Sequence, residues 1–367
     1  MPSYHFSLSY KDIVEQIKNI DPKQYAQTRN MLDGAVTRLS PYITRGVISL
    51  PYVRDTVLQN YSQKDSYKLI QELAWREYFQ KTWVARGDDI FIDLRFAQEP
   101  TDNAQMPKNI VDAATGIETI DKCIESLYKD GYMHNHARLT VASLCCNLGQ
   151  SHWKVPSAWM YYHLLDGDPA SNTLSWQWVA GTSISKKYFT DQSLINHWSG
   201  TQQSDTFLNF DREQTLKQTK PNELYYLETP TLETVLPRLE QKVDVTKETN
   251  ILLYHPFHLD PVWHRDKDAV RVLVFEPSWF KKHPVSEKVM KFIIDLAQEN
   301  IPNIQIFVGE YAELDINPIF QKAITREHPC TEHWTDCEKE PRAWLFPEVT
   351  GYYKSFFAFW KECEKYL

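Results

Sequence analysis

The sequence predicts an α + α/β fold: an all-helical domain over residues 1–202, a connector over 203–248, and a small parallel-sheet α/β domain over 249–367. Three observations support this division. Apolar residues recur at helical spacing through the first part, the middle part is polar, and short β-branched or aromatic runs characterise the last part. At 367 residues, with 42% hydrophobic and 24% charged residues, the chain is long enough to bury a sizeable core.

The helical domain is predicted from apolar residues at positions i, i+3 and i+4. The clearest segments are 10–20, 65–84, 117–129 and 136–148. Between them there is little of the strict alternation that a half-buried strand would show. The connector that follows is polar, and we expect it to contain some helix of its own.

The change of period after the connector predicts strands at 251–259, 269–277 and 303–311. A helical pattern at 286–300 separates the second strand from the third. A strand, a helix and a strand with a connection of this length indicate parallel pairing. The pattern at 352–367 predicts a closing helix.

Composition excludes several classes of site and partner. The chain has 11 glycines, and the closest pair, Gly34 and Gly46, lies twelve positions apart, so neither Gly-rich phosphate-binding loop can occur. A net charge of −8 argues against a broadly basic nucleic-acid-binding surface but leaves room for a local one. No apolar run could span a membrane and no signal peptide is evident, so we expect a cytoplasmic protein without a membrane partner.

The cysteines and histidines predict neither disulfides nor a metal site. The six cysteines form no C-x-x-C pair, so we expect free thiols. His328, Cys330, His333 and Cys337 share one short segment, but their spacing matches no strong zinc template. We therefore expect no metal.

A first candidate site lies in the segment RLSPYITRG, residues 38–46. Ser40 is a good helix N-cap and Pro41 suits the first helical position. With Thr37 and Arg38 beside free backbone N–H groups, the segment could hold a pyrophosphate. The alternative is ordinary helix capping without a ligand.

The segment ELAWREY, 72–78, provides a second candidate. Glu72, Trp75, Arg76 and Phe79 fall at i, i+3, i+4 and i+7, so a carboxylate, an indole and a guanidinium share one helical face with an aromatic ring. That composition is unlike a core stripe. The alternative is a surface pair between Glu72 and Arg76 with Trp75 half buried.

Two further segments complete the set. In GYMHNHARL, Asn135 and Arg138 lie one turn apart, and His134 and His136 are expected to point apart on a helix. In LLDGDPASNTLSWQWV, Asp168 is expected to cap a helix that begins with Pro169.

On the helix after Asp168, Asn172 and Trp176 are i, i+4 neighbours, whereas Trp176 and Trp178 must face different sides. Two indoles that leave one helical turn in different directions must either have two different functions or pack in two different places. Simple packing is the alternative if this motif stands alone.

Four motifs together resemble the photolyase/cryptochrome family in their order and in the number of residues between them. They are RLSPYITRG, ELAWREY, GYMHN with its following arginine, and LLDGD followed by WQW. The match covers residues from about 10 to 190. The resemblance implies a U-shaped FAD in a helical bowl, with an Arg138–Asp166 ion pair beside the flavin ring and the Asn172 amide facing its N5 atom. The implied cofactor-binding residues are Tyr25, Thr37, Arg38, Ser40, Arg138, Asp166, Asp168 and Asn172.

The resemblance also implies a substrate, UV-damaged DNA with a flipped-out pyrimidine dimer. Trp75 and Trp178 would form flat walls for the bases, Glu72 and Asn135 would bind base edges, and Arg76 would meet a phosphate or a developing anion. The implied enzyme is a deoxyribodipyrimidine photolyase, which splits cyclobutane dimers under blue light by electron transfer from excited reduced FAD. A (6-4) photolyase would carry histidines where Asn135 and Leu139 stand.

Trp176 and Trp153 match the first two members of the family's electron relay. The third member has no counterpart, so the relay would end at another aromatic such as Trp159, Tyr132 or Trp83. Thr173-Leu174-Ser175 and Thr190 also depart from the usual pattern, in positions that bear on DNA contacts. A cryptochrome-like blue-light sensor without repair activity is the alternative function, and a flavin-binding remnant without activity is a third.

The C-terminal α/β domain resembles the antenna domain that normally precedes the flavin domain in this family, which predicts a circular permutation. The resemblance leaves room for an antenna chromophore of unidentified kind. An unrelated α/β domain fused downstream is the alternative.

Overall fold

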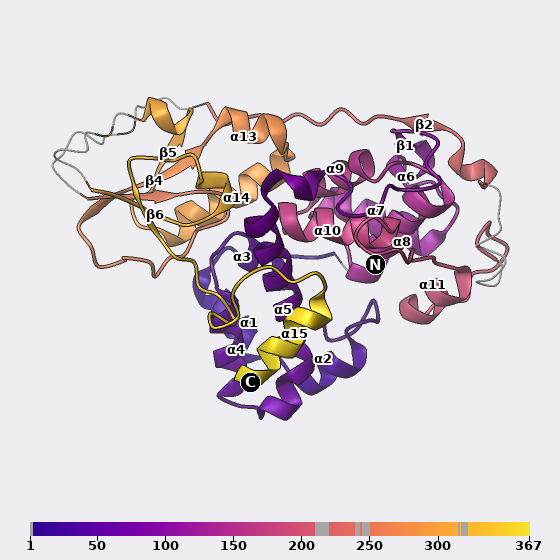
Figure 1. The fold of residues 1–367 in the computed structure, drawn as a ribbon, viewed down its shortest axis with the longest axis horizontal. Helices are drawn as coiled ribbons and strands as arrows, with labels where there is room; N and C mark the ends of the chain where they lie inside the picture. Colours follow the sequence, from indigo (N-terminus) through magenta and orange to yellow (C-terminus); the bar gives the residue numbers. More distant parts are fainter. Residues whose placement is uncertain (1–2, 210–219, 239–242, 244–249, 315, 317–321) are drawn as a thin grey trace.

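The computed structural model describes the chain except for residues 1–2, 210–219, 239–242, 244–249, 315 and 317–321 (Figure 1). A helical unit lies on one side of the molecule and a five-stranded sheet on the other. None of the helices in this described part combines the length and the apolar character needed to cross a membrane. The six cysteines all lie among the described residues and none of them forms a disulfide, as expected from their spacing.

The four predicted helical segments of the first part are confirmed. The helices of this unit are α1 Tyr10–Lys18, α2 Pro22–Thr28, α3 Ser40–Thr44, α4 Leu50–Leu58, α5 Gln63–Arg86, α6 Lys108–Val111, α7 Glu118–Asp130, α8 Asn135–Ser143, α9 Lys154–His163, α10 Pro169–Ala180 and α11 Gln192–Ser199. A π-helical turn, Leu144–Leu148, extends α8.

Side-chain caps fix where the two longest site-bearing helices begin. The Ser62 hydroxyl accepts a hydrogen bond from the Asp65 N–H at the start of α5. Asp168 caps α10 by accepting from the Ser171 N–H at 2.6 Å, and Pro169 opens the helix. The prediction for Asp168 and Pro169 is therefore confirmed.

The predicted N-cap at Ser40 is wrong. Leu39 precedes α3 with helical backbone angles, and Ser40 is already the first helical residue without a side-chain cap. Arg38, at φ 53°, adopts the left-handed conformation that turns the chain into this helix. The Ser40 hydroxyl instead hydrogen-bonds Asp166, a partner far away in the sequence.

The connector runs along the outside of the molecule between the two units (Figure 1). Its described part contains a single 3-10 turn, Asn222–Leu224, and the short strand β2 Leu227–Glu228, which pairs antiparallel with β1 Met106–Pro107. The further helix expected in this segment is not present there, and residues 210–219, 239–242 and 244–249 lie outside the described residues.

The α/β unit is a parallel sheet in the order β5-β4-β3-β6-β7. The three predicted strands are confirmed, whereas the sequence did not predict β6 and β7. The strands are β3 Asn250–Tyr254, β4 Ala269–Phe275, β5 Gln305–Val308, β6 Ala323–Arg326 and β7 Glu338–Glu340, with helices α13 Pro277–Lys282 and α14 Glu287–Asn300 between β4 and β5. Because β3 lies between β4 and β6, the chain reverses its direction of winding there, which creates a crevice at the carboxyl ends of β3 and β6.

One continuous core joins the helical unit to the sheet. It contains Ile13 of α1, Val53 of α4, Leu252 of β3 and Ile293 of α14. Close backbone contact also links the units, because a Cβ at Gly46 would lie 2.4 Å from the Phe257 carbonyl oxygen.

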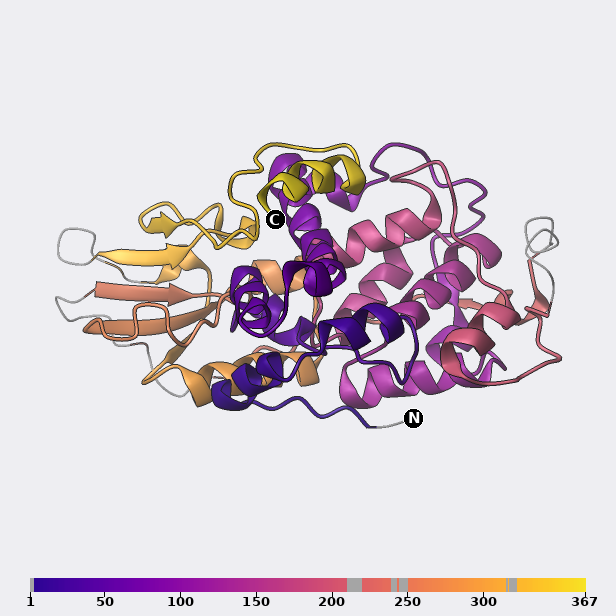
Figure 2. The ribbon, with the colours of Figure 1, turned by 90° about the horizontal axis from the view of Figure 1, so that it is seen from below.

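The closing helix α15, Phe356–Cys363, returns from the sheet to the helical unit and packs beside α5 (Figure 2). Glu77 on α5 anchors the segment that leads to it. This fully buried carboxylate accepts hydrogen bonds from the N–H groups of Leu345 and Phe346, and Lys81 lies 3.7 Å away. Burial raises the pKa of Glu77, and Lys81 and the two N–H groups partly offset that rise.

We expect Glu77→Gln to lower the free energy of unfolding by about 2 kcal/mol, because charge-assisted hydrogen bonds become neutral ones and an amide must sit opposite two donors. Urea unfolding at pH 7 measures this. Glu125→Gln, on the exposed face of α7, is the matched control and should change stability by less than about 0.5 kcal/mol. Equal stability of the two variants would contradict the anchoring role of Glu77.

Candidate functional site

A cavity of about 310 Å³ lies among α5, α8, α10 and the segment before α3. Pockets of this size and mixed lining are typical small-molecule sites. All but two of the residues predicted for the site line it. They are Tyr25, Thr37, Arg38, Ser40, Glu72, Trp75, Arg76, Asn135, Arg138, Asp166, Asp168, Asn172 and Trp176. Sequence analysis missed further lining residues, among them Tyr132, Met160, Leu164 and Ser171.

An ion pair between Arg138 and Asp166 forms one wall. The Arg138 Nη2 lies 3.0 and 2.9 Å from the two carboxylate oxygens, and its Nε donates to the Met133 carbonyl at 2.8 Å. Burial alone would raise the pKa of Asp166, but Arg138 and the Ser40 hydroxyl outweigh it and hold that pKa below its ordinary value. The wall therefore presents a fixed guanidinium and carboxylate at neutral pH.

The amide of Asn172 is oriented by Ser157 on α9. Asn172 Nδ2 donates to the Ser157 carbonyl at 3.0 Å and to its hydroxyl at 2.9 Å. Because a backbone carbonyl can only accept, the nitrogen of the amide must face Ser157. The oxygen Oδ1 remains as an acceptor for a ligand in the cavity.

Polar groups without partners lie at the cavity wall near α10 and α3. The Ser171 hydroxyl is buried and has no hydrogen-bond partner in the described structure. Arg38 lies over the Tyr4 ring at 5.0 Å and forms no ion pair with any carboxylate of the described residues. A guanidinium without a carboxylate partner and one unsatisfied hydroxyl beside apolar walls fit a ligand with phosphates and flat rings, and FAD is such a ligand.

The face of α5 that enters the cavity carries Glu72, Trp75, Arg76 and Phe79, as predicted. Glu72 pairs with Arg29 at 3.4 Å and Lys68 at 2.8 Å, so the alternative pairing with Arg76 is not formed. Local spacing could not predict Arg29 as the partner of Glu72, because Arg29 follows α2 and is distant from Glu72 in the sequence.

Arg76 donates to the Thr44 hydroxyl, and this bond links α5 to α3. Trp75 stacks on Phe356 of α15, with ring centres 3.7 Å apart and planes 10° apart. One face of this indole is thus covered by the C-terminal helix.

The two predicted residues outside the cavity lining are Trp178 and Trp153. Trp178 packs against Tyr188, with ring centres 5.7 Å apart, and so faces away from Trp176 as the spacing requires. The structure places it at the side of α10, not among the groups that line the cavity.

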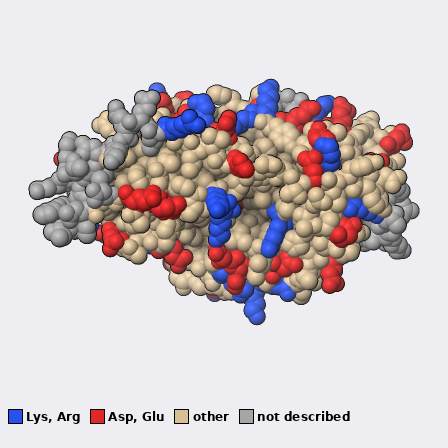
Figure 3. Space-filling model, turned by 90° about the horizontal axis from the view of Figure 1, so that it is seen from above, with Lys and Arg blue, Asp and Glu red and all other residues tan. Residues whose placement is uncertain are grey.

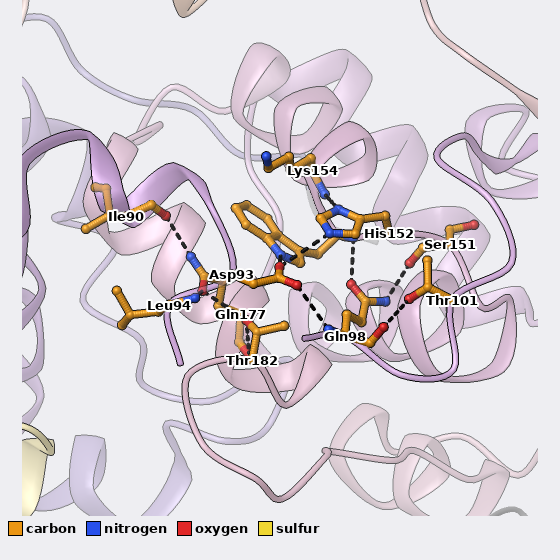
Figure 4. Close-up of polar contacts among 11 residues, drawn as sticks. Ile90, Asp93, Leu94, Gln98, Thr101, Ser151, His152, Lys154, Gln177 and Thr182 are labelled. Atoms are coloured by element: carbon orange, nitrogen blue, oxygen red, sulfur yellow. Dashed lines mark hydrogen bonds and ion pairs between the residues drawn. The ribbon is translucent and has the colours of Figure 1, made fainter. Parts of the chain in front are cut away.

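Trp153 is buried and held by a residue that the sequence did not single out. Its Nε1 donates to Asp93 Oδ1 at 2.7 Å, and Asp93 also lies 3.3 Å from His152 Nε2 (Figure 4). The Gln98 side chain accepts from the Trp153 N–H and donates to the Ser151 carbonyl. The segment that follows α5 thus supplies a carboxylate to the indole of Trp153.

The expected divergence of His134 and His136 is wrong. His134 is the extended N-cap of α8 and lies outside the helix, so helical spacing does not apply to the pair. Their rings stack with centres 5.8 Å apart. His134 Nε2 bonds the Arg29 carbonyl, and its Nδ1 accepts from the His136 N–H, so this histidine is satisfied by backbone groups.

Charge on the face shown in Figure 3 is mixed, with acidic and basic side chains interspersed and no continuous basic field. This agrees with the acidic net charge. An anionic partner that met this face would therefore have to use individual cations rather than a continuous basic surface.

Comparison with known proteins gives a family match over the helical unit. Residues 69–229 match the family described as the FAD binding domain of DNA photolyase. A cryptochrome DASH of Gloeobacter violaceus is 30% identical over 204 residues, which cover 48% of this chain and 40% of the relative. A deoxyribodipyrimidine photo-lyase of Thermus thermophilus is 29% identical over 168 residues, covering 44% of this chain and 39% of the relative.

The aligned region thus spans about two fifths of the length of these curated relatives. Among solved structures, a Synechocystis cryptochrome matches with a TM-score of 0.46 and 22% identity, over 53% of this chain and 46% of that chain.

Proposed function

We propose that this chain binds FAD in the 310 Å³ cavity and splits cyclobutane pyrimidine dimers in DNA under blue light, because residues 69–229 match the FAD binding domain of DNA photolyase. One observation carries the proposal. The residues expected around the cofactor and, except for Trp178, those expected at the substrate line this one cavity, although most of them come from separate helices, α2, α3, α5, α8 and α10.

When bound, reduced FAD would supply light-driven electron-transfer chemistry, and the protein would supply binding and orientation. Arg38, Thr37 and Ser40 would hold the phosphates, with Ser171 as an added donor and Tyr25 alongside. The Arg138–Asp166 pair would fix the ring system from one side, and Asn172 Oδ1 would accept a hydrogen bond from it. Gln80 Nε2 donates a hydrogen bond to Asp168 Oδ2 at 2.6 Å, and this contact closes the cavity wall between α10 and α5.

At the substrate side, Trp75 would provide an apolar wall for a flipped base, and Trp178 would provide a second one at the rim of the site. Glu72 and Asn135 would bind the polar edges of the bases. Arg76, already directed by Thr44, would meet the negative charge that develops on the dimer. No general acid or covalent nucleophile is required for such a reaction.

For reduction of the cofactor, Trp176 and Trp153 would form the relay. Asp93 is a hydrogen-bond acceptor for the indole N–H of Trp153, and a carboxylate at this position stabilises positive charge on the ring. We therefore place Asp93 at the outer end of the two-tryptophan relay.

A blue-light sensor without repair activity is the second candidate, and one contact favours it. Phe356 of α15 covers one face of Trp75, the indole expected to receive the substrate. In a sensor, that contact would couple the cavity to the C-terminal helix. In a repair enzyme, the substrate base would stack on the opposite face of Trp75.

Glu72→Ala tests the assignment of the substrate side. We expect the rate of dimer repair under saturating light to fall about 10- to 100-fold, since hydrogen bonds worth about 1–3 kcal/mol are lost. The absorption spectrum of the bound flavin should stay unchanged. Repair is measured by the loss of dimers from an irradiated oligonucleotide after the flavin has been chemically reduced.

Glu125→Ala is the control, because Glu125 is exposed on α7 and does not line the cavity. It should leave both repair and spectrum unchanged. Loss of FAD from Glu72→Ala would show that Glu72 holds the cofactor, and unchanged repair would remove it from the substrate side.

A further inference from the structure

Two histidines and a cysteine meet at the carboxyl ends of β3 and β6, outside the flavin cavity. His255 directly follows β3, and His328 and Cys330 follow β6. All three side chains are buried, with exposed fractions of 1%, 7% and 6%. This place is the crevice where the winding of the sheet reverses, the position at which open α/β sheets bind ligands.

The three potential ligand atoms lie within 4.8 Å of one another. Cys330 Sγ is 2.9 Å from His328 Nδ1 and 3.5 Å from His255 Nδ1. Metal–sulfur bonds of about 2.3 Å and metal–nitrogen bonds of about 2.0 Å, at tetrahedral angles, place such atoms about 3.5 Å apart. The pair with His255 has this separation, and the pair with His328 needs to open by about half an ångström.

The ring of His255 is oriented as a metal ligand would be. Its Nε2 lies 3.2 Å from the Arg326 carbonyl, and because that oxygen can only accept, Nε2 carries the proton and Nδ1 bears the lone pair. A backbone carbonyl on the second nitrogen is the usual support of a histidine ligand. The lone pairs of His255 and His328 accept from the N–H groups of Phe257 and Cys330 at 3.3 and 3.1 Å, contacts that an ion would replace.

The site also has a small cavity for an ion and a carboxylate close to it. A cavity of about 10 Å³, about the volume of one water-sized sphere, is lined by two of the three residues, His255 and Cys330, and by Glu276, whereas His328 does not line it. Glu276 is buried and is held by Trp334 Nε1 and His333 Nε2. With a thiolate and the Glu276 carboxylate, the charges would sum to zero for a divalent ion such as Zn²⁺ and to −1 for Cu⁺.

We propose that His255, His328 and Cys330 form a binding site for one thiophilic d¹⁰ cation, Zn²⁺ or Cu⁺. A thiolate with two imidazoles selects these ions over Mg²⁺ or Ca²⁺. On binding, the S–H bond of Cys330 breaks, its proton leaves to solvent, a metal–sulfur bond forms, and no group is oxidised or reduced. The ion would join the loops after β3 and β6.

This site replaces the grouping considered from sequence alone. Of His328, Cys330, His333 and Cys337, the structure retains the first two. His333 bonds Glu276, and Cys337 lies against the Trp334 carbonyl. The third ligand, His255, comes from another strand, so local spacing could not reveal it.

The test uses the full-length protein after chelator treatment, titrated anaerobically with Co²⁺ as an optical probe. We expect one Co²⁺ per chain, with a thiolate charge-transfer band and ligand-field bands at wavelengths longer than flavin absorption. Zn²⁺ should bleach these bands. A parallel titration with Cu⁺ against a chromophoric chelator decides which of the two ions binds more tightly.

Cys330→Ser and His255→Gln should each weaken Co²⁺ binding at least about tenfold. Cys337→Ser and His333→Gln are the matched controls from the same loop and should bind as the parent does. Circular dichroism and FAD content confirm that each variant folds, and His328→Gln substitutes for any that does not. Absence of Co²⁺ bands in the parent, or equal bands in Cys330→Ser and Cys337→Ser, would overturn the proposal.

Discussion

Asp166→Asn is expected to weaken FAD binding by roughly 150-fold or more. The substitution keeps the shape of the side chain but removes the charge that compensates Arg138, whose guanidinium lies 2.9 Å away in the cavity wall. Breaking a buried ion pair from one side costs about 3 kcal/mol or more, and each 1.4 kcal/mol is a factor of ten in affinity. Purified protein should therefore lose most of its visible flavin absorption on gel filtration.

The control for this experiment is Asp121→Asn. Asp121 caps the loop before α7 through Thr115 and Gly116 and does not line the cavity. We expect that variant to lose some stability but to retain a full complement of FAD. If Asp166→Asn retained FAD as tightly as the parent, the cofactor would have to lie elsewhere, and the cavity assignment would be wrong.

Acid is expected to destabilise the protein steeply below pH 6.5. Burial is the main cause that lowers the pKa of His134, His163 and His283, each to about 4, assisted by His136, Lys288 and Lys282 respectively. The unfolded chain, with ordinary histidine pKa values of about 6.5, takes up protons first as the pH falls. The stabilisation from neutral histidines is thus complete above pH 6.5 and is lost between 6.5 and 4.

At pH 5.5 each of these histidines costs about 1.4 kcal/mol, so together they lower the free energy of unfolding by about 4 kcal/mol relative to neutral pH. Urea titrations at both pH values measure this. His163→Gln should reduce the pH dependence by about 1.4 kcal/mol, the contribution of one such ring, and His5→Gln, at an exposed position, is the matched control. A free energy of unfolding that stays constant from pH 7 to 5.5 would contradict the buried, neutral state of these rings.

The parts of the fold that follow from local sequence were predictable. Helical periodicity located α5 and α14, and the Asp168–Pro169 pair marked the start of α10 because capping depends on neighbours in sequence. Strand β6 reads Ala-Ile-Thr-Arg and β7 reads Glu-Lys-Glu, so neither lies in a long β-branched or aromatic run like those that predicted the other three strands. Their pairing in the sheet, not their composition, makes them strands.

Tertiary contacts explain most of the remaining differences. Ser40 does not cap α3 as predicted, because its hydroxyl hydrogen-bonds Asp166. His134 does not follow helical spacing, because it is the N-cap of α8 and lies outside the helix. The contacts of Asp93 with Trp153 and of Phe356 with Trp75 join segments distant in the chain. No local pattern encodes such contacts, whereas the four cavity motifs were recognisable because each is a run of neighbouring residues.

The most direct test of the proposed function is a light-dependent repair assay on the purified protein. With FAD fully reduced and an oligonucleotide containing a cyclobutane pyrimidine dimer, blue light should remove the dimers with turnover, and the dark control should remove none. Binding of the oligonucleotide without loss of dimers, with the flavin reduced throughout illumination, would contradict the repair function and leave the light sensor as the account of this cavity.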